Sequence, residues 1–87
     1  MIKIKELKIG KITHYYDKIG VAVVALENTL LLEDEITIVN NHNKFKQIVR
    51  SMQLEHKQLT SAKKGQSIGL KVDQPVKTGS LVLKVKS

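Results

Sequence analysis

The central part of the chain, Phe45 to Lys64, has a hydrophobic pattern on which the interpretation of the whole sequence depends. Its apolar residues and one histidine recur at spacings of three and four, as on one face of an α-helix. These residues are Phe45, Ile48, Val49, Met52, His56 and Leu59. Lys63 and Lys64, followed by Gly65, are also typical of the last turn and the end of a helix. Periodicity by itself therefore favours a helix.

Other features of this stretch favour a strand. In a helix, Leu54 would lie off the apolar face, and the hydroxyls of Thr60-Ser61 would compete for backbone groups. From Arg50 onward the residues alternate as in a strand, and a bulge near Arg50 would bring Val49 onto the side of Met52. The pattern of this stretch leaves both interpretations open.

The segments on either side of this stretch predict strands. Val21–Leu26 is the most apolar run, and its β-branched residues bounded by turn residues predict a strand buried on both faces. Asn40–Asn43 has the composition of a turn, which predicts a hairpin and a strand beginning at Lys44. Further strands are predicted at 7–16, 36–39, 67–72 and 81–85. About six short strands separated by turns predict a small closed barrel or sandwich.

The chain has 87 residues, enough for one domain. We expect residues 1–6 to form an N-terminal arm or edge segment and residues 7–87 to form the domain, because the alternation changes phase at Leu7. Aromatic residues make up 3 % of the chain, so the core must consist of Ile, Val and Leu, which suits strands. The N-terminus has no apolar run of signal-peptide length, and no segment is long enough to span a membrane. With no cysteine, the composition fits a cytoplasmic protein.

The sequence contains no pattern typical of a catalytic, metal or cofactor site. The histidines His14, His42 and His56 have no metal-ligand spacing, and without cysteine there is no thiolate ligand or nucleophile. The acidic residues between Glu27 and Glu35 predict a solvated loop. The glycines form no phosphate-binding loop, and no serine lies in a nucleophile elbow. We therefore expect a protein that is not an enzyme and has no cofactor.

The net charge of +7, from 15 basic and 8 acidic residues, fits a nucleic-acid partner. Fourteen of the basic residues are lysine, however, and arginine is the residue that reads bases and binds phosphate in a bidentate manner. The charge by itself therefore favours a solvated surface over a binding face. If the central stretch is a strand, Lys44, Lys46 and Arg50 share one exposed face with Ile48. The candidate nucleic-acid contacts are Lys44, Lys46, Arg50, Lys57, Lys63, Lys64 and Lys71.

Several segments, taken in order, resemble the second-domain β-barrel of translational GTPases such as elongation factor Tu. They are Ile9-Gly10-Lys11-Ile12, Leu32–Ile36, Arg50–Leu54 and Ala62–Leu70. An overlapping set resembles more closely the small C-terminal barrel of the collagenase-like peptidase family, some of whose members take part in tRNA hydroxylation. That set is Gly10–Tyr16, Ile19–Val23, Ser51–His56, Gly69–Val72 and Gly79–Val85. One departure is Glu33-Asp34, where these barrels usually have Gly-Asp.

The resemblance implies a fold and a kind of function. It implies an all-β protein with a six-stranded closed barrel, in which Phe45–Leu54 is a strand and Gln58–Gly65 is a loop. The residues of a GTPase or peptidase domain are not in this sequence, so no activity is implied. We predict a non-enzymatic barrel that binds RNA (tRNA or rRNA) or a ribonucleoprotein through a basic face. The alternative is a protein-interaction module, a detached accessory domain of a peptidase-like or tRNA-modifying enzyme; the oligomeric state stays open.

Overall fold

The computed structural model describes residues 5–86, and these form strands and turns with no helix among them. The strands are β1 Lys5–Tyr16, β2 Val21–Leu26, β3 Leu30–Leu31, β4 Glu35–Val39, β5 Lys44–Ile48, β6 Met52–Leu54, β7 Lys57–Leu59, β8 Ser61–Ala62, β9 Ser67–Lys71 and β10 Leu81–Lys86. Most of the predicted N-terminal arm, residues 1–4, lies outside the described residues, while Lys5 and Glu6 pair with Lys86 and Val85 as part of β1. Within the described range, no helix is long and apolar enough to cross a membrane.

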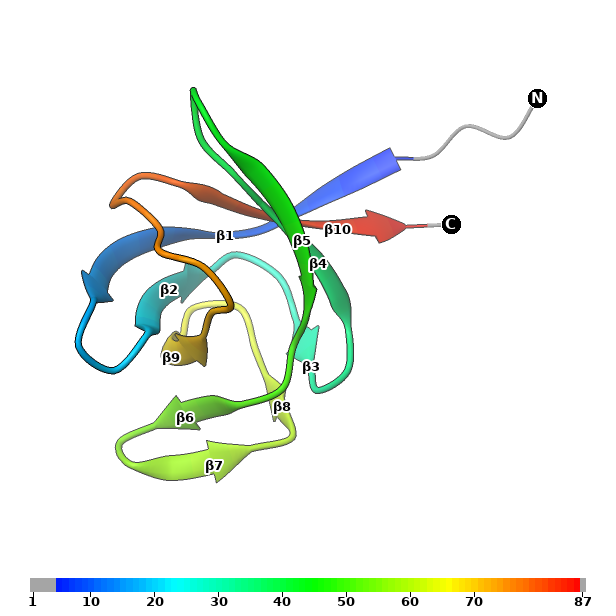
Figure 1. Cartoon of the computed structure of the whole chain (residues 1–87). Helices are drawn as coiled ribbons and strands as arrows, with labels where there is room; N and C mark the ends of the chain where they lie inside the picture. Colours follow the sequence, from blue (N-terminus) through cyan, green and yellow to red (C-terminus); the bar gives the residue numbers. More distant parts are fainter. Residues whose placement is uncertain (1–4, 87) are drawn as a thin grey trace.

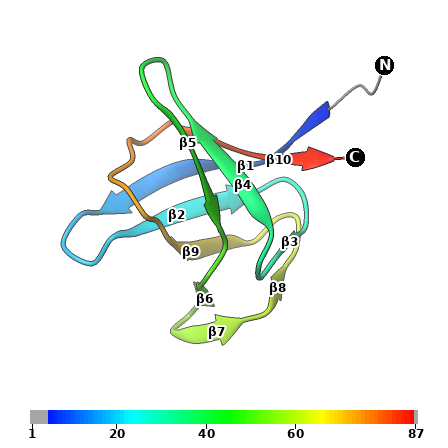
Figure 2. The same ribbon diagram turned by 45° about the vertical axis from the view of Figure 1, so that its right-hand side comes forward.

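The strands form one curved antiparallel sheet and one short ribbon (Figure 1 and Figure 2). The strand order in the sheet is β5-β4-β10-β1-β2-β9-β6-β7, and the ribbon pairs β3 with β8. The predicted all-β architecture is confirmed. The predicted closure and strand number are not, because the edge strands β5 and β7 are not paired with each other and the sheet has eight strands rather than six.

The disputed central stretch is extended, as the resemblance implied. It forms β5 and β6, and the chain turns between them at Val49–Ser51. Backbone bonds fix this turn: Glu33 N–H donates to Val49 O over 2.8 Å, and Val49 N–H donates to Asp34 O over 2.9 Å. Up to this turn the alternation is regular, with Gln47 and Val49 inward and Ile48 outward. The turn, which lies where we predicted a bulge, shifts the phase so that Met52, three residues after Val49, is also buried, and this produces the helix-like spacing of apolar residues.

The segment after β6 differs from our prediction of a loop over Gln58–Gly65. Lys57–Leu59 forms β7 against β6, and Ser61–Ala62 forms β8 against β3. A tight turn at Glu55 and His56, both with positive φ, joins β6 to β7. These short pairings satisfy backbone groups that a free loop would leave to water.

The core is aliphatic and lies inside the curve of the sheet. The fully buried large residues include Ile9, Ile12 and Leu30 from the first third of the chain and Met52 and Leu70 from the second half. The prediction that β2 is buried on both faces is correct for one face only. Ala22, Val24 and Leu26 are buried, whereas Val21, Val23 and Ala25 are half-buried on the opposite, outer face. We expected β2 to be buried on both faces, and within the described residues it is not.

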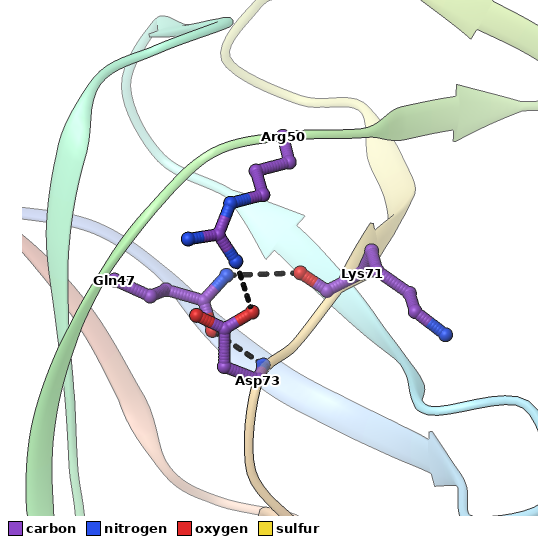
Figure 3. A network of polar contacts seen from close by, with 4 residues as sticks. All are labelled: Gln47, Arg50, Lys71 and Asp73. Atoms are coloured by element: carbon purple, nitrogen blue, oxygen red, sulfur yellow. Dashed lines mark hydrogen bonds and ion pairs between the residues drawn. The ribbon is translucent and has the colours of Figure 1, made fainter.

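A buried glutamine links two strands that are not neighbours in the sheet (Figure 3). The Gln47 side chain on β5 donates from Nε2 to Lys71 O over 2.9 Å and accepts at Oε1 from Asp73 N–H over 2.8 Å. Lys71 N–H in turn donates to Ser51 O over 3.1 Å. The end of β9 is thus held to β5 by a side chain rather than by a strand ladder. Arg50 joins the same network through an exposed ion pair with Asp73 at 2.8 Å.

Candidate functional site: a basic groove

A groove of about 620 Å³ opens beside the hairpin that joins β4 and β5. Its volume lies in the range of roughly 300–1,000 Å³ that is usual for small-ligand sites. The residues that line it come from β1, from the end of β4 and the following turn, and from the loop before β10. They are Lys8, Lys11, Val39, Asn40, Asn41, His42, Lys77, Thr78, Gly79 and Leu81. We call this the basic groove.

The strand register explains why lysines border an apolar floor. One cross-strand row runs from Lys11 on β1 through Leu81 and Val39 to Lys44 on β5. Residues opposite one another in a sheet project from the same face, so the two lysines lie on either side of the two apolar residues. At about 4.8 Å between neighbouring strands, the backbones of the two lysines are roughly 14 Å apart.

The next row repeats this arrangement. It runs from Lys8 through Leu83 and Thr37 to Lys46. Thr37 is buried although it shares the face of Lys46. The two rows together place a pair of lysines on each side of the floor.

A β-bulge in β1 brings Lys8 and Lys11 to the same face. Residues three apart in a regular strand project to opposite faces. Here the register shifts between Lys8 and Gly10, so that Lys8 pairs with Leu83 and Lys11 with Leu81, two residues apart on β10. The bulge residue, Ile9, has its carbonyl oxygen bonded by Glu27 N–H at 2.7 Å and Asn28 N–H at 3.2 Å. Both lysines therefore face the groove side of the sheet.

The loops of the groove are held by hydrogen bonds of their own. Asn40 Oδ1 accepts from the N–H groups of His42 and Asn43, at 2.8 and 2.9 Å, which fixes the turn after β4. On the other wall, Gly79 N–H donates to Ile12 O over 2.8 Å, and Gly79 has a φ of 95°. These contacts place the exposed side chains of His42 and Lys77 at the groove without using them in the fold.

The groove is electropositive. Its lining includes Lys8, Lys11 and Lys77 and no carboxylate. Lys8 Nζ lies 2.8 Å from Glu27 Oε2, but both side chains are about half exposed, so solvent screens this pair. Lysine binds phosphate and carboxylate groups as a point charge. The groove can therefore hold an anion, and the lining has no carboxylate to act with His42 in acid–base chemistry. Among residues 5–86 there is also no group of three or more His, Cys, Asp or Glu that would hold a metal ion.

The seven cations predicted from the sequence do not form one patch. Lys44 and Lys46 are exposed on β5, next to the groove in register, and Arg50 follows them in its ion pair with Asp73. Lys57 lies on the edge strand β7. The others lie at opposite ends of β9: Lys63 and Lys64 in the turn before it, and Lys71 at its last residue, where Nζ donates to Ile19 O over 2.6 Å.

The sequence analysis missed four residues of the groove: Lys8, Lys11, Lys77 and His42. Lys8 and Lys11 were missed because residues three apart in a regular strand project from opposite faces. His42 was assigned only to a turn, and Lys77 lies in a loop that no pattern marked. A bulge in β1 is the feature that would have predicted the first pair.

No family model matches this chain. A curated relative is an uncharacterized protease of Methanocaldococcus jannaschii, which is 33 % identical over 85 residues. The match covers 97 % of this chain and 21 % of that protein, so the chain spans about a fifth of the length of this relative.

Two solved structures have the same fold. Both are the C-terminal domain of a putative U32 peptidase of Geobacillus thermoleovorans, one of them as its selenomethionine variant. The variant superposes with a TM-score of 0.85 at 22 % identity, covering 90 % of this chain and 99 % of that one. The other has a TM-score of 0.83 at 20 % identity and covers 92 % of each chain.

The chain has the same fold as the C-terminal domain of this putative U32 peptidase. The predicted resemblance to the small barrel of a peptidase family is thereby confirmed at the level of the fold. The likeness to the second domain of elongation factor Tu is not shown. The cytoplasmic location and the RNA partner stay predictions.

Proposed function

We propose that this chain is a non-enzymatic accessory domain that associates with a larger peptidase-like protein. One observation carries the proposal: almost the whole chain corresponds to about a fifth of a relative named as a protease. The fold of a domain cut from a putative peptidase supports it. The buried polar residues Gln47 and Ser80 fit the non-enzymatic part of the proposal, because their side chains form hydrogen bonds within the protein itself.

We also infer that the sheet is a variant of the closed barrel predicted from the sequence. In a closed six-stranded barrel, a backbone ladder between β5 and β9 would complete the sheet. Here the Gln47 side chain joins β5 to the end of β9 instead. The ribbon of β3 and β8 lies beside this opening, since Glu33 and Asp34 bond Val49. A barrel completed by side chains would be rigid enough to serve as a docking module.

The accessory-domain proposal predicts a protein partner. A tagged copy of the chain, expressed in the cells that encode it, is expected to retain a peptidase-like protein in about equal amount. The reason is that an accessory domain without activity acts only through the chain to which it binds. Affinity purification followed by mass spectrometry measures this, with an unrelated tagged β-domain as control. Retention of RNA without protein, or peptide hydrolysis by the purified chain alone, would contradict the proposal.

A second candidate function is the binding of RNA (tRNA or rRNA) or a ribonucleoprotein. The basic groove favours it, because three lysines line the groove, Lys44 and Lys46 flank it, and no lining residue is acidic. Lysine–phosphate contacts release counterions, so the affinity would fall steeply as salt rises.

Replacing Lys8, Lys11 and Lys77 with glutamine is the test of this second function. We expect weaker binding of a fluorescent tRNA and a slope of log K against log salt that is smaller by about 2–3, since each lost phosphate contact removes nearly one unit. Fluorescence anisotropy over a range of salt measures both quantities.

A matched control separates the groove from overall charge. Replacing Lys57, Lys63 and Lys64 with glutamine gives the same change in net charge, from +7 to 7 − 3 = +4, and is expected to leave most of the affinity. Equal losses in the two triple variants would mean that binding follows net charge and not the groove. If the unaltered chain shows no affinity below about 100 μM at low salt, RNA binding is ruled out, because non-specific binding usually reaches that range.

A further inference from the structure

The outer face of β2 is apolar, and nothing in the described part of the chain covers it. Val21, Val23 and Ala25 project from this face and are half-buried by their neighbours alone. A strand with apolar residues at both parities is typical of a sheet covered on both sides. The core covers one side of β2, so any cover for the other side would come from outside these residues.

The strands on either side of β2 complete a shallow surface. On β1, Tyr16 lies opposite Val21 and His14 lies opposite Val23. The ring centroids of His14 and Tyr16 are 4.3 Å apart, and the ring planes meet at 58°. On β9, Gly69 lies opposite Val23. We call this surface the outer β2 face and define it as His14, Tyr16, Val21, Val23, Ala25 and Gly69.

Small residues and an aromatic give this face the composition of a binding surface. Gly69 has no side chain to stand above its neighbours, and a Cβ there would lie 3.2 Å from Val21 Cγ1. At one end, Tyr16 is 49 % exposed and Ile19, in the turn that joins β1 to β2, is 58 % exposed. Exposed aromatic and aliphatic side chains beside a low apolar centre are typical of the anchors of protein interfaces.

Cations border the outer β2 face at both ends. Lys71 lies opposite Val21, and Lys11 lies opposite Ala25. The turn that carries Lys63 and Lys64 adjoins the Ala25 end, since Leu26 N–H donates to Gln66 O and Gly65 N–H donates to Leu26 O. A second copy of the chain fits this face poorly, because a two-fold contact would bring these lysines against each other. A partner with an apolar centre and an acidic border fits it well.

We propose that the outer β2 face docks on the peptidase-like partner, through a partner surface that is apolar at its centre and acidic at its border. This inference rests on the proposed function as an accessory domain. The size of the relative supports this occupant, because about four fifths of that protein lies outside the region that matches this chain. The fold neighbours are likewise domains of a larger protein.

A site-specific cross-link tests the docking. The photoreactive residue p-benzoylphenylalanine replaces Tyr16, an exposed aromatic at the edge of the face, in the tagged chain within its own cells. The same residue replaces Ile48 in one control and Lys77 in another, which places it on the exposed side of β5 or in the basic groove. After irradiation, we expect an adduct with a protein of peptidase-like sequence from position 16, at least fivefold more abundant than from positions 48 and 77.

Further substitutions, made in the chain that carries p-benzoylphenylalanine at position 16, distinguish docking from chance proximity. V21Q with V23Q removes the apolar centre, and K11E with K71E reverses two border charges. Each pair is expected to lower the adduct at least fivefold, whereas I48Q leaves it unchanged. Thermal melting of each variant shows whether it is folded, and only folded variants are compared.

The outcomes distinguish the docking face from the proposed function. If the peptidase-like protein co-purifies but cross-links best from position 48 or 77, or from none of the three, the outer β2 face is wrong and the accessory role stands. An adduct with a second copy of the chain or with RNA at position 16 also overturns the docking. If no peptidase-like protein co-purifies and no protein adduct forms, both proposals fail.

Discussion

Replacing Gly10 with alanine is expected to lower the free energy of unfolding by about 3 kcal/mol, at the upper end of what overpacking usually costs. Gly10 lies on β1 where β2 crosses it closely. A Cβ there would lie 2.5 Å from the carbonyl oxygen of Ala25 and 2.8 Å from Val24 Cγ1. The first of these atoms is backbone and cannot turn aside, so the two strands would have to separate.

Thermal melting measures this loss. For a domain of this size, about 3 kcal/mol corresponds to a decrease in Tm of more than about 10 °C. Gly69→Ala is the matched control on the same sheet, because its new methyl group would meet a side-chain methyl of Val21 at 3.2 Å and no close backbone atom. We expect it to melt within a few degrees of the unaltered chain, by the same scale. A Gly10→Ala protein that melts like the control would show that β1 and β2 do not approach as closely as described.

Replacing Gln47 with leucine is expected to cost about 2 kcal/mol, because each of its two partners is only part-buried and lies at the lower end of the range of about 1–3 kcal/mol for a group left without a hydrogen bond. The substitution removes the hydrogen bond to Lys71 O and the hydrogen bond from Asp73 N–H, and it fills the space with an apolar side chain of similar size. It also removes the link between β5 and the end of β9. Urea unfolding measures the loss as a lower midpoint.

Two variants show whether the loss comes from these two bonds. Arg50→Ala breaks the neighbouring ion pair with Asp73, whose side chains are 65 % and 37 % exposed, and is expected to cost less than about 1 kcal/mol. Gln47→Glu still accepts from Asp73 N–H, but its carboxylate faces the Lys71 carbonyl. It should be destabilised at neutral pH and recover part of the loss at low pH, where the protonated carboxyl group donates to that carbonyl. If Gln47→Leu unfolds like the unaltered chain, the glutamine is not what joins the two strands.

The stability tests bear on both proposed surfaces. The bulge after Lys8 and the close crossing at Gly10 belong to the same short part of β1, and together they place Lys8 and Lys11 beside the groove. The outer β2 face depends on the pairing of β2 with β1 and β9. Binding experiments on either surface therefore need variants that keep these strands in register.

Local patterns in the sequence were enough for most strands and for the direction of many side chains. The alternation in 67–72 and 81–85 predicted the bounds of β9 and β10 nearly to the residue, and it also gave the buried face of β9. For β10 it indicated the wrong face, because Val82 lies in the core and Val85 is exposed. These features depend on a period of two along one strand, which any window of the sequence contains. The central stretch was different, because a turn at Val49–Ser51 breaks its alternation, and the resemblance to known barrels was needed to decide for a strand there.

By itself, the sequence determined that the segments on either side of the central stretch are strands, that the core is aliphatic, and that the chain carries no familiar catalytic pattern. The tertiary structure alone decided which cations lie together and which apolar face is left uncovered. The register shift in β1 unites Lys8 with Lys11, and the strand order separates Lys57 on β7 from Lys44 on β5. The physical reason is that bulges, register and strand order depend on cross-strand partners dozens of residues away. A local pattern of side chains carries no information about those partners.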